Sequence, residues 1–544
     1  MQQGLTLVSE IAANWDTLAR DLRIEGNQLQ AGWPAGAPST LDAVAPLHFL
    51  SLFVIPPDGP DPALLVLEAS FDCSRDTFID QLVQTNAPLL QAAYAYCVSY
   101  PPNATNQQLR AYLGGLEHCN QIFYVGCPGL GTQRIAEEEQ IAADVEARIR
   151  ALNQPIGRRA QIVREIWQGL TPQSRERVLD TPDRPFWVRH PLYEEPLATL
   201  YWYLERPAFI VGWFVLALVI LQPFDAPLWD ALVAPPSVVA ATWCWALVLL
   251  GCAAALTLIW LAIWVGEFPR ELTWRTIWYV IGAKIAEFLR ASWGALPGFG
   301  AVLGLLALAH WTWPLLWQLA WIGLVVLAAA ALVAAIVWVV RLLRIGVREP
   351  GDSVDDKRWD AARIARMRER EDHLAQTHLI SVTTIRPGAL RLCTLRYVLF
   401  AIHWLARILY NRLGLFSTQS IHFARWTIIP GRRLLFISNY DGSFGGYLGV
   451  FATLGGSGVS AIWGNTEGFP RTFLLFLDGA RDEQGLKARA RASQVESLLW
   501  YRRYPRLSVT AIERNAAIRS DLARFSRAAF RVPEAELDAF LRRF

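Results

Sequence analysis

Residues 238–265 read VVAATWCWALVLLGCAAALTLIWLAIWV and contain no Asp, Glu, Lys or Arg. A helix needs about 20 mostly apolar residues to cross a bilayer, so this stretch is long enough for one span. Three further uncharged stretches, 208–224, 293–309 and 315–340, lie on either side of it. A globular core rarely contains helices that are apolar all round over such lengths. The sequence therefore predicts a block of four transmembrane helices.

The basic residues of this region predict how the block is oriented. Lys and Arg occur before the first stretch, between the second and third, and after the fourth, whereas residues 225–237 and 310–314 contain none. Basic segments remain on the cytoplasmic side of a membrane. Four spans then place both termini in the cytoplasm, and we expect a multi-pass protein of the bacterial inner membrane. Pro297 and nearby glycines leave a re-entrant third segment as the alternative.

The overall composition limits the classes of function. The chain has 544 residues, a formal net charge of +3 and 7 cysteines without a CxxC pair. This length leaves room for two further domains beside the membrane block. The small charge, without a basic patch carrying base-stacking aromatics, argues against a nucleic-acid partner. Cysteines without such paired spacing favour reduced thiols over a disulfide framework. HExxH, GxSxG and paired-cysteine zinc motifs are absent, so the sequence indicates no particular reaction.

Two regions on either side of the apolar block share one order of predicted elements: strand, helix, two strands, helix, strand. Apolar periodicity and turn residues place the first set at 5–8, 11–29, 48–55, 64–69, 74–92 and 94–99. The second set is expected at 379–385, 391–410, 422–429, 433–438, from 443, and at 461–465. This order is the ferredoxin-like one. We predict an α+β fold with a helical membrane block, in which two ferredoxin-like (βαββαβ) domains flank four transmembrane helices.

The two regions also match position by position, which indicates an internal duplication. Three sets of landmarks keep constant spacings of 374, 369 and 377 positions. These sets contain His48 and His422, Asp72 and Asp441, and Tyr124 and Tyr501, respectively.

The strands near 47–55 and 423–429 are apolar on both faces, so both faces of each sheet need cover. Helices can cover one face, and the sheet of the other copy can cover the second. Intramolecular pairing of the two domains is the simplest arrangement, and a homodimer is the alternative. The predicted divisions are a first ferredoxin-like cytoplasmic domain at 1–152, a linker at 153–205, the membrane block at 206–343, a charged juxtamembrane helix at 344–376 and a second ferredoxin-like cytoplasmic domain at 377–544.

A polar cluster joins a predicted strand to a predicted helix in the second domain, where the sequence reads NYDGS at 439–443. Asp and Ser at such a junction cap the helix by accepting hydrogen bonds from its first free N–H groups. The functional alternative is a polar site at the mouth of a sheet cavity. The first copy has Cys73 where Gly442 stands, so such a site is not duplicated. The candidate binding residues are Asn439, Asp441, Ser443 and Asp72.

Two histidines of the second domain are candidates for chemistry. His422 begins a predicted strand, and His403 lies in the apolar helix 391–410. Either imidazole can shuttle protons or ligate iron, although a structural histidine bonded within the core is the simpler interpretation. Strict alternation puts His422 and Arg425 on opposite faces of their strand, so we expect that they do not line one pocket.

Three segments carry a resemblance: IHFARW at 421–426, FISNYDGS at 436–443 and TEGFPRT at 466–472. They resemble an uncharacterised family of bacterial membrane proteins with tandem ferredoxin-like domains. More remotely, the paired domains are similar to the dimeric α+β barrel group, which includes dye-decolourising peroxidases and chlorite dismutases. That resemblance implies haem, with Asp441 as distal acid/base and His403 or His422 as iron ligand. Ser438 stands where the first glycine of that group's GxxDG motif is expected.

Two classes of function follow. The first is a non-catalytic integral membrane protein whose paired cytoplasmic domains bind an apolar ligand or a protein partner. The second is a haem-dependent, peroxidase-like oxidoreductase anchored to the lipid bilayer. Transport is a weaker third hypothesis, because the apolar stretches lack the ionisable residues that mark a pathway.

Overall fold

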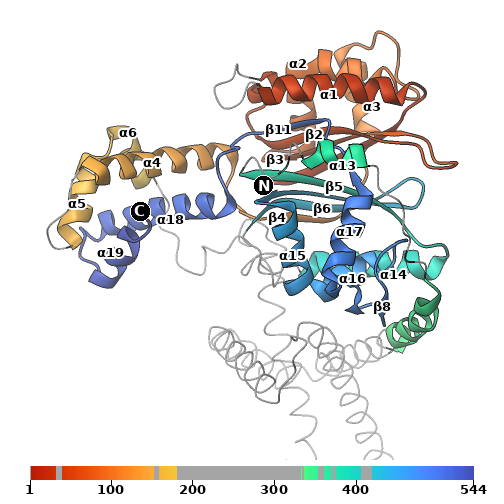
Figure 1. The fold of residues 1–544 in the computed structure, drawn as a ribbon. Coiled ribbons are helices and arrows are strands. Elements are labelled where there is room, and N and C mark those ends of the chain that lie inside the picture. Colours follow the sequence, from red (N-terminus) through yellow and green to blue (C-terminus); the bar gives the residue numbers. More distant parts are fainter. Residues whose placement is uncertain are drawn as a thin grey trace, which may run out of the picture.

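The structure is a computed structural model, and it describes most of the chain outside the apolar block. The described residues are 2–31, 39–151, 159–180, 333, 336–352, 354, 361–368, 371, 375–405 and 420–544. Two antiparallel sheets lie face to face, each covered on its outer side by helices, and an arm of helices projects from one side (Figure 1).

The first sheet has four strands in the order β1-β3-β2-β11. Every residue of β2 and β3 is buried, because one face meets the helices and the other meets the second sheet. The strands are β1 (Gln3–Glu10), β3 (Leu64–Phe71), β2 (Leu47–Ile55) and β11 (Leu499–Arg502), and the covering helices are α1 (Trp15–Ala31), α2 (Arg75–Tyr94) and α3 (Asn106–Gly114).

The second sheet has five strands in the order β10-β5-β7-β6-β4. Its helices form the layer opposite the first sheet (Figure 1). The strands are β10 (Gln494–Val495), β5 (Gln376–Thr384), β7 (Arg433–Asp441), β6 (Ile421–Ile429) and β4 (Asn120–Val125), and the helices are α14 (Ala389–Leu405), α15 (Phe444–Leu454), α16 (Gly456–Trp463) and α17 (Glu483–Ser493).

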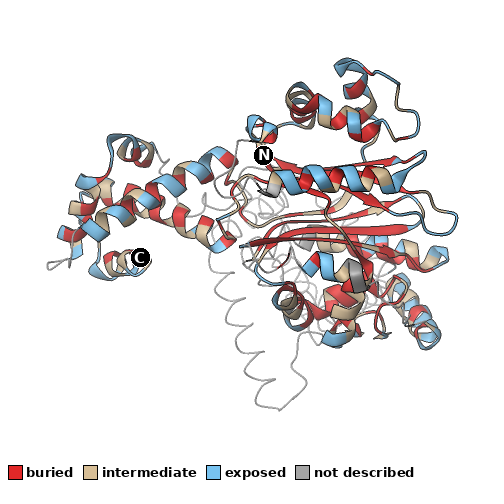
Figure 2. Cartoon of the chain, turned by 45° about the horizontal axis from the view of Figure 1, so that its top comes forward, coloured by how far each residue is buried: buried red, intermediate tan, exposed pale blue. Residues whose placement is uncertain are grey.

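The two halves of the chain exchange one edge strand each. Strand β4 of the first half pairs with β6 of the second, and Tyr124 lies opposite Ala424. Strand β11 of the second half pairs with β2 of the first, and Tyr501 lies opposite Leu50. These two pairings are equivalent under the repeat, so the halves are related by an approximate two-fold symmetry. Figure 2 shows the red, buried strands stacked between the outer helices.

The space between the sheets is filled by side chains. Ile380, Leu435 and Ile437 of the second sheet belong to the same core as the first sheet. An ion pair also crosses between the sheets, with 3.0 Å from Arg425 Nη2 to Glu68 Oε2, and both side chains are buried. Burial alone would raise the pKa of Glu68, but the attraction of Arg425 and the contacts of His378 and Asn439 together outweigh it and hold this pKa below its usual value. The paired sheets therefore form a packed core rather than a cavity for a ligand.

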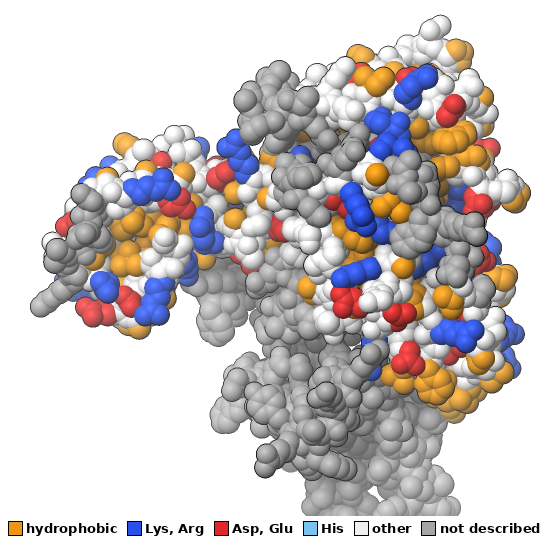
Figure 3. Space-filling view, viewed as in Figure 1, with side chains coloured by type: hydrophobic (Ala, Val, Ile, Leu, Met, Phe, Trp, Pro, Cys, Tyr) orange, Lys and Arg blue, Asp and Glu red, His pale blue; other side chains and the backbone are white. Residues whose placement is uncertain are grey.

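Five helices form the arm, and they enclose a core of their own. The long helices α4 and α18 occupy equivalent positions in the repeat and pack on each other. Basic and acidic side chains are interspersed over the arm on the face shown in Figure 3, and Arg514 pairs with Glu146 across α4 and α18 at 3.2 Å. The arm helices are α4 (Thr132–Ala151), α5 (Arg159–Gly169), α6 (Pro172–Leu179), α18 (Val509–Arg527) and α19 (Glu534–Leu541).

Shorter elements connect these layers. Helices α5 and α6 occupy part of the range predicted as a linker, and α13 occupies part of the charged segment 344–376. The short elements are η1 (Thr40–Ala43), η3 (Glu349–Gly351), α13 (Ala361–Arg368), β8 (Thr472–Phe473), β9 (Leu477–Asp478) and η5 (Gly479–Arg481).

The predicted membrane block is corrected by the structure. Among the described residues, no helix has the length and apolar character that a membrane span needs. This finding contradicts the predicted fold class, the multi-pass inner-membrane location and the membrane-anchored functions. The four apolar stretches themselves lie outside the described residues, apart from 333 and 336–340. The described fold is a mixed one, with two facing sheets, their outer helices and an arm.

The predicted last strand of each repeat is also wrong. Helices α2 and α16 continue to Tyr94 and Trp463, and the chain then turns. Residues 94–99 and 461–465 therefore form no strand. At these places the described chain forms isolated β-bridges, such as the one between Ile11 and Cys97. The next long strand of each half, β4 in the first and β11 in the second, joins the sheet of the other half instead.

Candidate functional site

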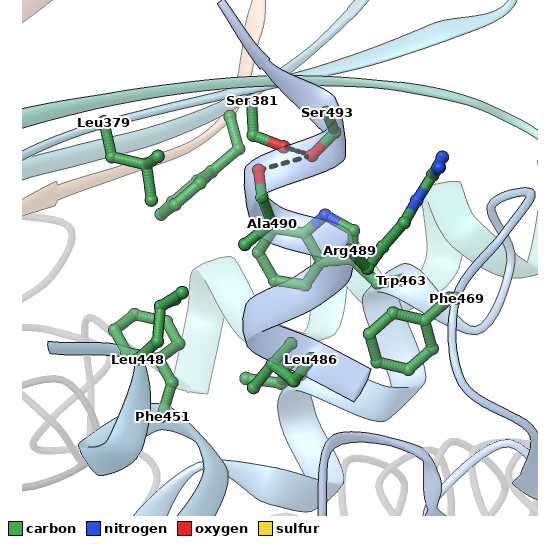
Figure 4. A pocket seen from close by; sticks show the side chains of 12 residues that line it. Leu379, Ser381, Leu448, Phe451, Trp463, Phe469, Leu486, Arg489, Ala490 and Ser493 are labelled. Carbon is green, nitrogen blue, oxygen red and sulfur yellow. Dashed lines mark hydrogen bonds between the residues drawn. The ribbon is translucent and has the colours of Figure 1, made fainter. Parts of the chain in front are cut away.

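A pocket lies between the second sheet and helices α15, α16 and α17 (Figure 4). A sphere of the size of a water molecule can occupy about 30 Å³ of it, which is far below the volume of an ordinary small-molecule site, so a bound molecule larger than water has to widen the pocket. The lining residues are Leu379, Ser381, Phe436, Leu448, Phe451, Val459, Trp463, Phe469, Leu486, Arg489, Ala490 and Ser493.

Strand and helix periodicity place these side chains on one surface. In β5, Leu379 and Ser381 are two residues apart and face the helices, whereas Ile380 faces the first sheet. In α17, Leu486, Arg489, Ala490 and Ser493 recur at the three- and four-residue spacing of one helix face. Asp482 caps this helix by accepting a hydrogen bond from the Gly485 backbone N–H at 3.0 Å.

Two serine hydroxyls form a polar point in an otherwise apolar wall. The Oγ atoms of Ser381 and Ser493 are 2.7 Å apart. Ser493 Oγ also donates to the Ala490 carbonyl at 3.1 Å, so Ser381 is the donor to Ser493. Each hydroxyl keeps lone-pair capacity for a hydrogen bond from a ligand. Four aromatic rings supply most of the apolar surface, from Phe436, Phe451, Trp463 and Phe469.

Arg489 is the charged residue among those that line the pocket. Its guanidinium lies against the backbone of Gly468, because a Cβ atom at that position would be 2.7 Å from Arg489 Nη1. The aliphatic part of an arginine can line an apolar wall while its head reaches more polar surroundings. Arg489 therefore lines the pocket with the aliphatic part of its side chain, and its guanidinium points away from the lumen (Figure 4).

The equivalent space in the first half is occupied by larger side chains. The repeat aligns α17 with α3, and it places Leu7, Tyr112, Leu113 and Leu116 at the positions of Ser381, Arg489, Ala490 and Ser493. Leu7 and Leu113 are fully buried. The Tyr112 hydroxyl is 2.7 Å from Ser9 Oγ and donates to the Val98 carbonyl at 2.9 Å. The pocket thus reflects substitutions in one copy of a duplicated scaffold.

The structure brings together two of the predicted site residues, His422 and Asp441. The distance from His422 Nε2 to Asp441 Oδ1 is 2.8 Å. The other carboxylate oxygen of Asp441 accepts the backbone N–H of Val509, the first residue of α18, at 2.7 Å. This contact stabilises the helix end, because the first N–H groups of a helix lack partners within it.

The first half repeats this arrangement. His48 Nε2 lies 2.6 Å from Asp72 Oδ1, and Asp72 Oδ2 accepts the backbone N–H of Thr132, the first residue of α4, at 2.6 Å. Burial alone would raise the pKa of Asp72, but the hydrogen bonds from His48 and Thr132 outweigh it and leave this pKa lowered. Each His–Asp pair therefore holds an arm helix against a sheet in both halves. The prediction that a functional site at 439–443 is not duplicated stays a prediction.

The two His–Asp pairs differ at the second imidazole nitrogen. His48 Nδ1 lies 2.8 Å from the Tyr504 hydroxyl. Burial raises the pKa of Tyr504 well above its ordinary value, so the phenol keeps its proton, and the protonation of His48 decides which of the two groups donates. The repeat places Cys127 at the position equivalent to Tyr504, next to His422. The pair of the first half is therefore the more completely bonded one.

A strand irregularity explains why His422 and Arg425 face the same side. The pairing of β6 with β7 shifts register between Ile421 and Phe423. The His422 ring consequently lies 5.4 Å from the ring of Phe49 in the first sheet, and Arg425 also contacts that sheet. The prediction of opposite faces is wrong because a bulge breaks the alternation.

The remaining predicted site residues lie apart from one another. Asn439 Oδ1 accepts a hydrogen bond from Trp500 Nε1 at 2.9 Å, between the sheets. Ser443 caps α15 by accepting the Gly446 N–H at 3.1 Å. His403 is on α14, in the helix layer outside the second sheet. These residues therefore do not form a single site with Asp441.

This geometry contradicts the haem peroxidase hypothesis. Both Asp441 oxygens are engaged, by His422 and by the end of α18. The pocket is on the opposite face of the second sheet, and its lining contains neither Asp441 nor a histidine. Within the described residues, no group of three or more His, Cys, Asp or Glu side chains could hold a metal ion.

Comparison with known proteins adds no relative. No protein-family model, curated protein or solved structure matches this chain. The resemblance to an uncharacterised bacterial family stays a prediction.

Sequence reasoning missed Ser381, Arg489, Ala490 and Ser493. The available signal was the repeat itself, because the spacing between Tyr124 and Tyr501 continues backward through α3 and α17. Three of these four positions change from leucine to a smaller side chain. A position-by-position comparison of the two copies would have pointed to the pocket.

Proposed function

We propose that this protein binds a small organic molecule in the pocket between the second sheet and helices α15 to α17. The observation that carries the proposal is the replacement of three leucines and one tyrosine of the first half by Ser381, Ala490, Ser493 and Arg489. The ligand would lie among four aromatic rings and reach the serine pair.

Packing energetics support this interpretation. Protein interiors are close-packed, and empty space left by small side chains lowers stability. The first half demonstrates that leucine is compatible with this fold at three of these positions. A ligand that occupies the pocket would restore the lost contacts, and its binding free energy would offset the cost of the empty space.

The proposed role is binding without catalysis. The lining residues include no carboxylate, imidazole or thiol. The serine hydroxyls are bonded to each other, and neither has a base within the lining to activate it. Substrate turnover by covalent or acid–base chemistry therefore has no support from these residues.

The test introduces the side chains of the first half into the second. Toluene and indole serve as probes, and saturation-transfer NMR with the full-length protein reports their binding. We expect both probes to bind the wild-type chain and to lose binding in the double variant Ala490→Leu/Ser493→Leu. Gln484→Leu is the matched control, because Gln484 is exposed on the same helix.

Two results would contradict the proposal. One is the absence of binding of either probe to the wild-type chain. The other is unchanged binding in a double variant that is folded by circular dichroism. Loss of binding in the Gln484→Leu control as well would show that added apolar bulk on α17 acts without filling the pocket, and that too would count against the proposal.

A further inference from the structure

We infer that the helix at residues 336–348 presents a docking face for a second helix, formed by residues 274–289 of the same chain. The inference is independent of the pocket and of its ligand. It rests on an exposed stripe of apolar side chains in the described structure and on a matching stripe in the sequence.

The exposed apolar side chains lie along one face of this helix. They recur at spacings of three, four, three and four residues, which keeps them in line along an α-helix. Their exposed fractions run from 43% to 82%. The residues of this apolar stripe are Val333, Ile336, Val340, Leu343 and Val347.

The opposite face of the same helix attaches it to the second half. At about 3.6 residues per turn, Trp338 and Ile345 lie on the side away from the stripe. The ring centroids of Trp338 and Tyr397 are 4.6 Å apart, so the helix packs on α14 (Figure 1), and Ile345 is fully buried. Directly after the helix, Glu349 accepts the backbone N–H of Leu475 at 2.8 Å. These contacts fix the helix, and the apolar stripe therefore points away from the second half.

The form of the stripe indicates what covers it. Contiguous exposed apolar surface marks an interaction site, and alternating spacings of three and four residues are those of a helix-packing seam. Arg341, Arg344 and Arg348 follow one side of the stripe. A partner that is apolar all round would bury these charges, whereas a helix with a single apolar face would leave them in water. The stripe therefore fits an amphipathic helix.

The segment 274–289 has this character. It reads WRTIWYVIGAKIAEFL, and its large apolar residues recur at helical spacings of three, four, four and three. Arg275 and Glu287 fall on the other side of such a helix. The four long uncharged stretches of the chain have no comparable polar side. The apolar residues of the segment are Trp274, Ile277, Ile281, Ile285 and Phe288.

Length and connectivity favour this segment over a second copy of the chain. The stripe from Val333 to Val347 and the one from Trp274 to Phe288 cover the same number of residues, so two helices of equal length would meet along their whole seam. Both stripes belong to one chain, which makes docking intramolecular and raises the effective concentration of the segment above that of a separate molecule.

Photo-crosslinking of the full-length protein tests this assignment. The photoreactive amino acid p-benzoylphenylalanine replaces Leu343 in the stripe, and mass spectrometry of the digested protein identifies what it has bonded to. We expect cross-links to peptides from 274–289, while the intact protein keeps the mass of one chain. The matched control carries the same group at Arg348, which is exposed on a neighbouring face of the helix, and should lose these cross-links.

A variant that blocks docking provides a second measurement. Leu343 is exposed in the described structure, so Leu343→Glu should remain folded by circular dichroism. It places a carboxylate on the apolar stripe, and we expect trypsin to cleave after Arg275 and Lys284 faster than in the wild-type chain, because an undocked segment is open to the protease. Arg348→Glu is the matched control and should leave the rate of cleavage at these two residues unchanged.

The other possible occupants are outcomes that would overturn the inference. Cross-links from position 343 to a second copy, to lipid or detergent, or to parts of the chain outside 274–289 would each assign the face to something else. Absence of any cross-link from position 343 would contradict docking altogether. Equal rates of cleavage in Leu343→Glu and in the wild-type chain would do the same.

Discussion

In the first half of the chain, Tyr112 and Leu113 close the space between the sheet and helix α3, whereas in the second half Arg489 and Ala490 leave it open. The backbone around these residues is alike. Thr105 caps α3 and Asp482 caps α17, each by accepting an N–H three residues further on. The difference between a solid core and a pocket is therefore produced by side chains on a shared frame.

The helices beside this space support the same conclusion. In α2 the chain leaves helical geometry at Asn86. The equivalent residue of the second half is Gly455, where α15 gives way to α16. Even an irregularity of the scaffold is kept in both copies. The two copies thus share the frame and differ in the side chains on one helix face.

The largest effect is expected at the ion pair between the sheets, where the first half has Ser51 at the position of Arg425. Replacing Arg425 by Met leaves Glu68 buried without its cation, and we expect the free energy of unfolding to fall by about 3–5 kcal/mol. Denaturant unfolding measures this loss. The matched control is Ser51→Ala at the equivalent position of the first half, for which a change well below that of Arg425→Met is expected. Equal effects at the two positions would contradict the asymmetry.

The next effect tests whether a pocket can be created in the first half. Leu113 is fully buried, and Leu113→Ala should lower the free energy of unfolding by about 2–5 kcal/mol. Ala490→Leu makes the reverse change in the second half and should raise it by roughly 0.5–2 kcal/mol. Thermal unfolding of both variants provides the comparison. A destabilised Ala490→Leu variant would show that the second half has no space to fill.

The smallest of the three effects concerns the His48–Asp72 pair, which holds the first residue of α4 against the first sheet. Asp72→Asn weakens the cap on Thr132 and should cost about 0.5–2 kcal/mol at neutral pH. The pKa of Asp72 in the folded chain is lowered from 3.8. Its contribution is therefore fully present above the unfolded pKa and is lost as the pH falls through the lower folded pKa. Unfolding curves of wild type and variant between neutral and acidic pH should accordingly converge. A difference between them that is constant with pH would contradict this role.

Much of the strand pattern could be predicted from the sequence, because apolar runs with flanking turns specify it locally. The hairpins near 48–69 and 422–438 correspond to β2 with β3 and to β6 with β7. Ser443 behaves as the predicted helix cap. These features depend on residues that are close together in the chain.

The exchanged strands were beyond such reasoning, because nothing local identifies a strand's partner. The apolar residues at 94–99 predict a strand, but Tyr94 ends a buried helix, and a short apolar run does not distinguish a strand from a helix end. The face of His422 was mispredicted because one bulge inverts the alternation. The membrane block was predicted from hydropathy alone, and no described helix meets that criterion.

The exchange of β4 and β11 also has a consequence for how the chain is made. Strand β2 is complete after residue 55, but its neighbour β11 begins at residue 499. At a synthesis rate of about 5–20 residues per second, the edge of β2 waits on the order of tens of seconds for its partner. An unpaired edge is a template for wrong pairing. During translation the β2 edge of the first sheet therefore stays open to wrong pairing until β11 has been synthesised.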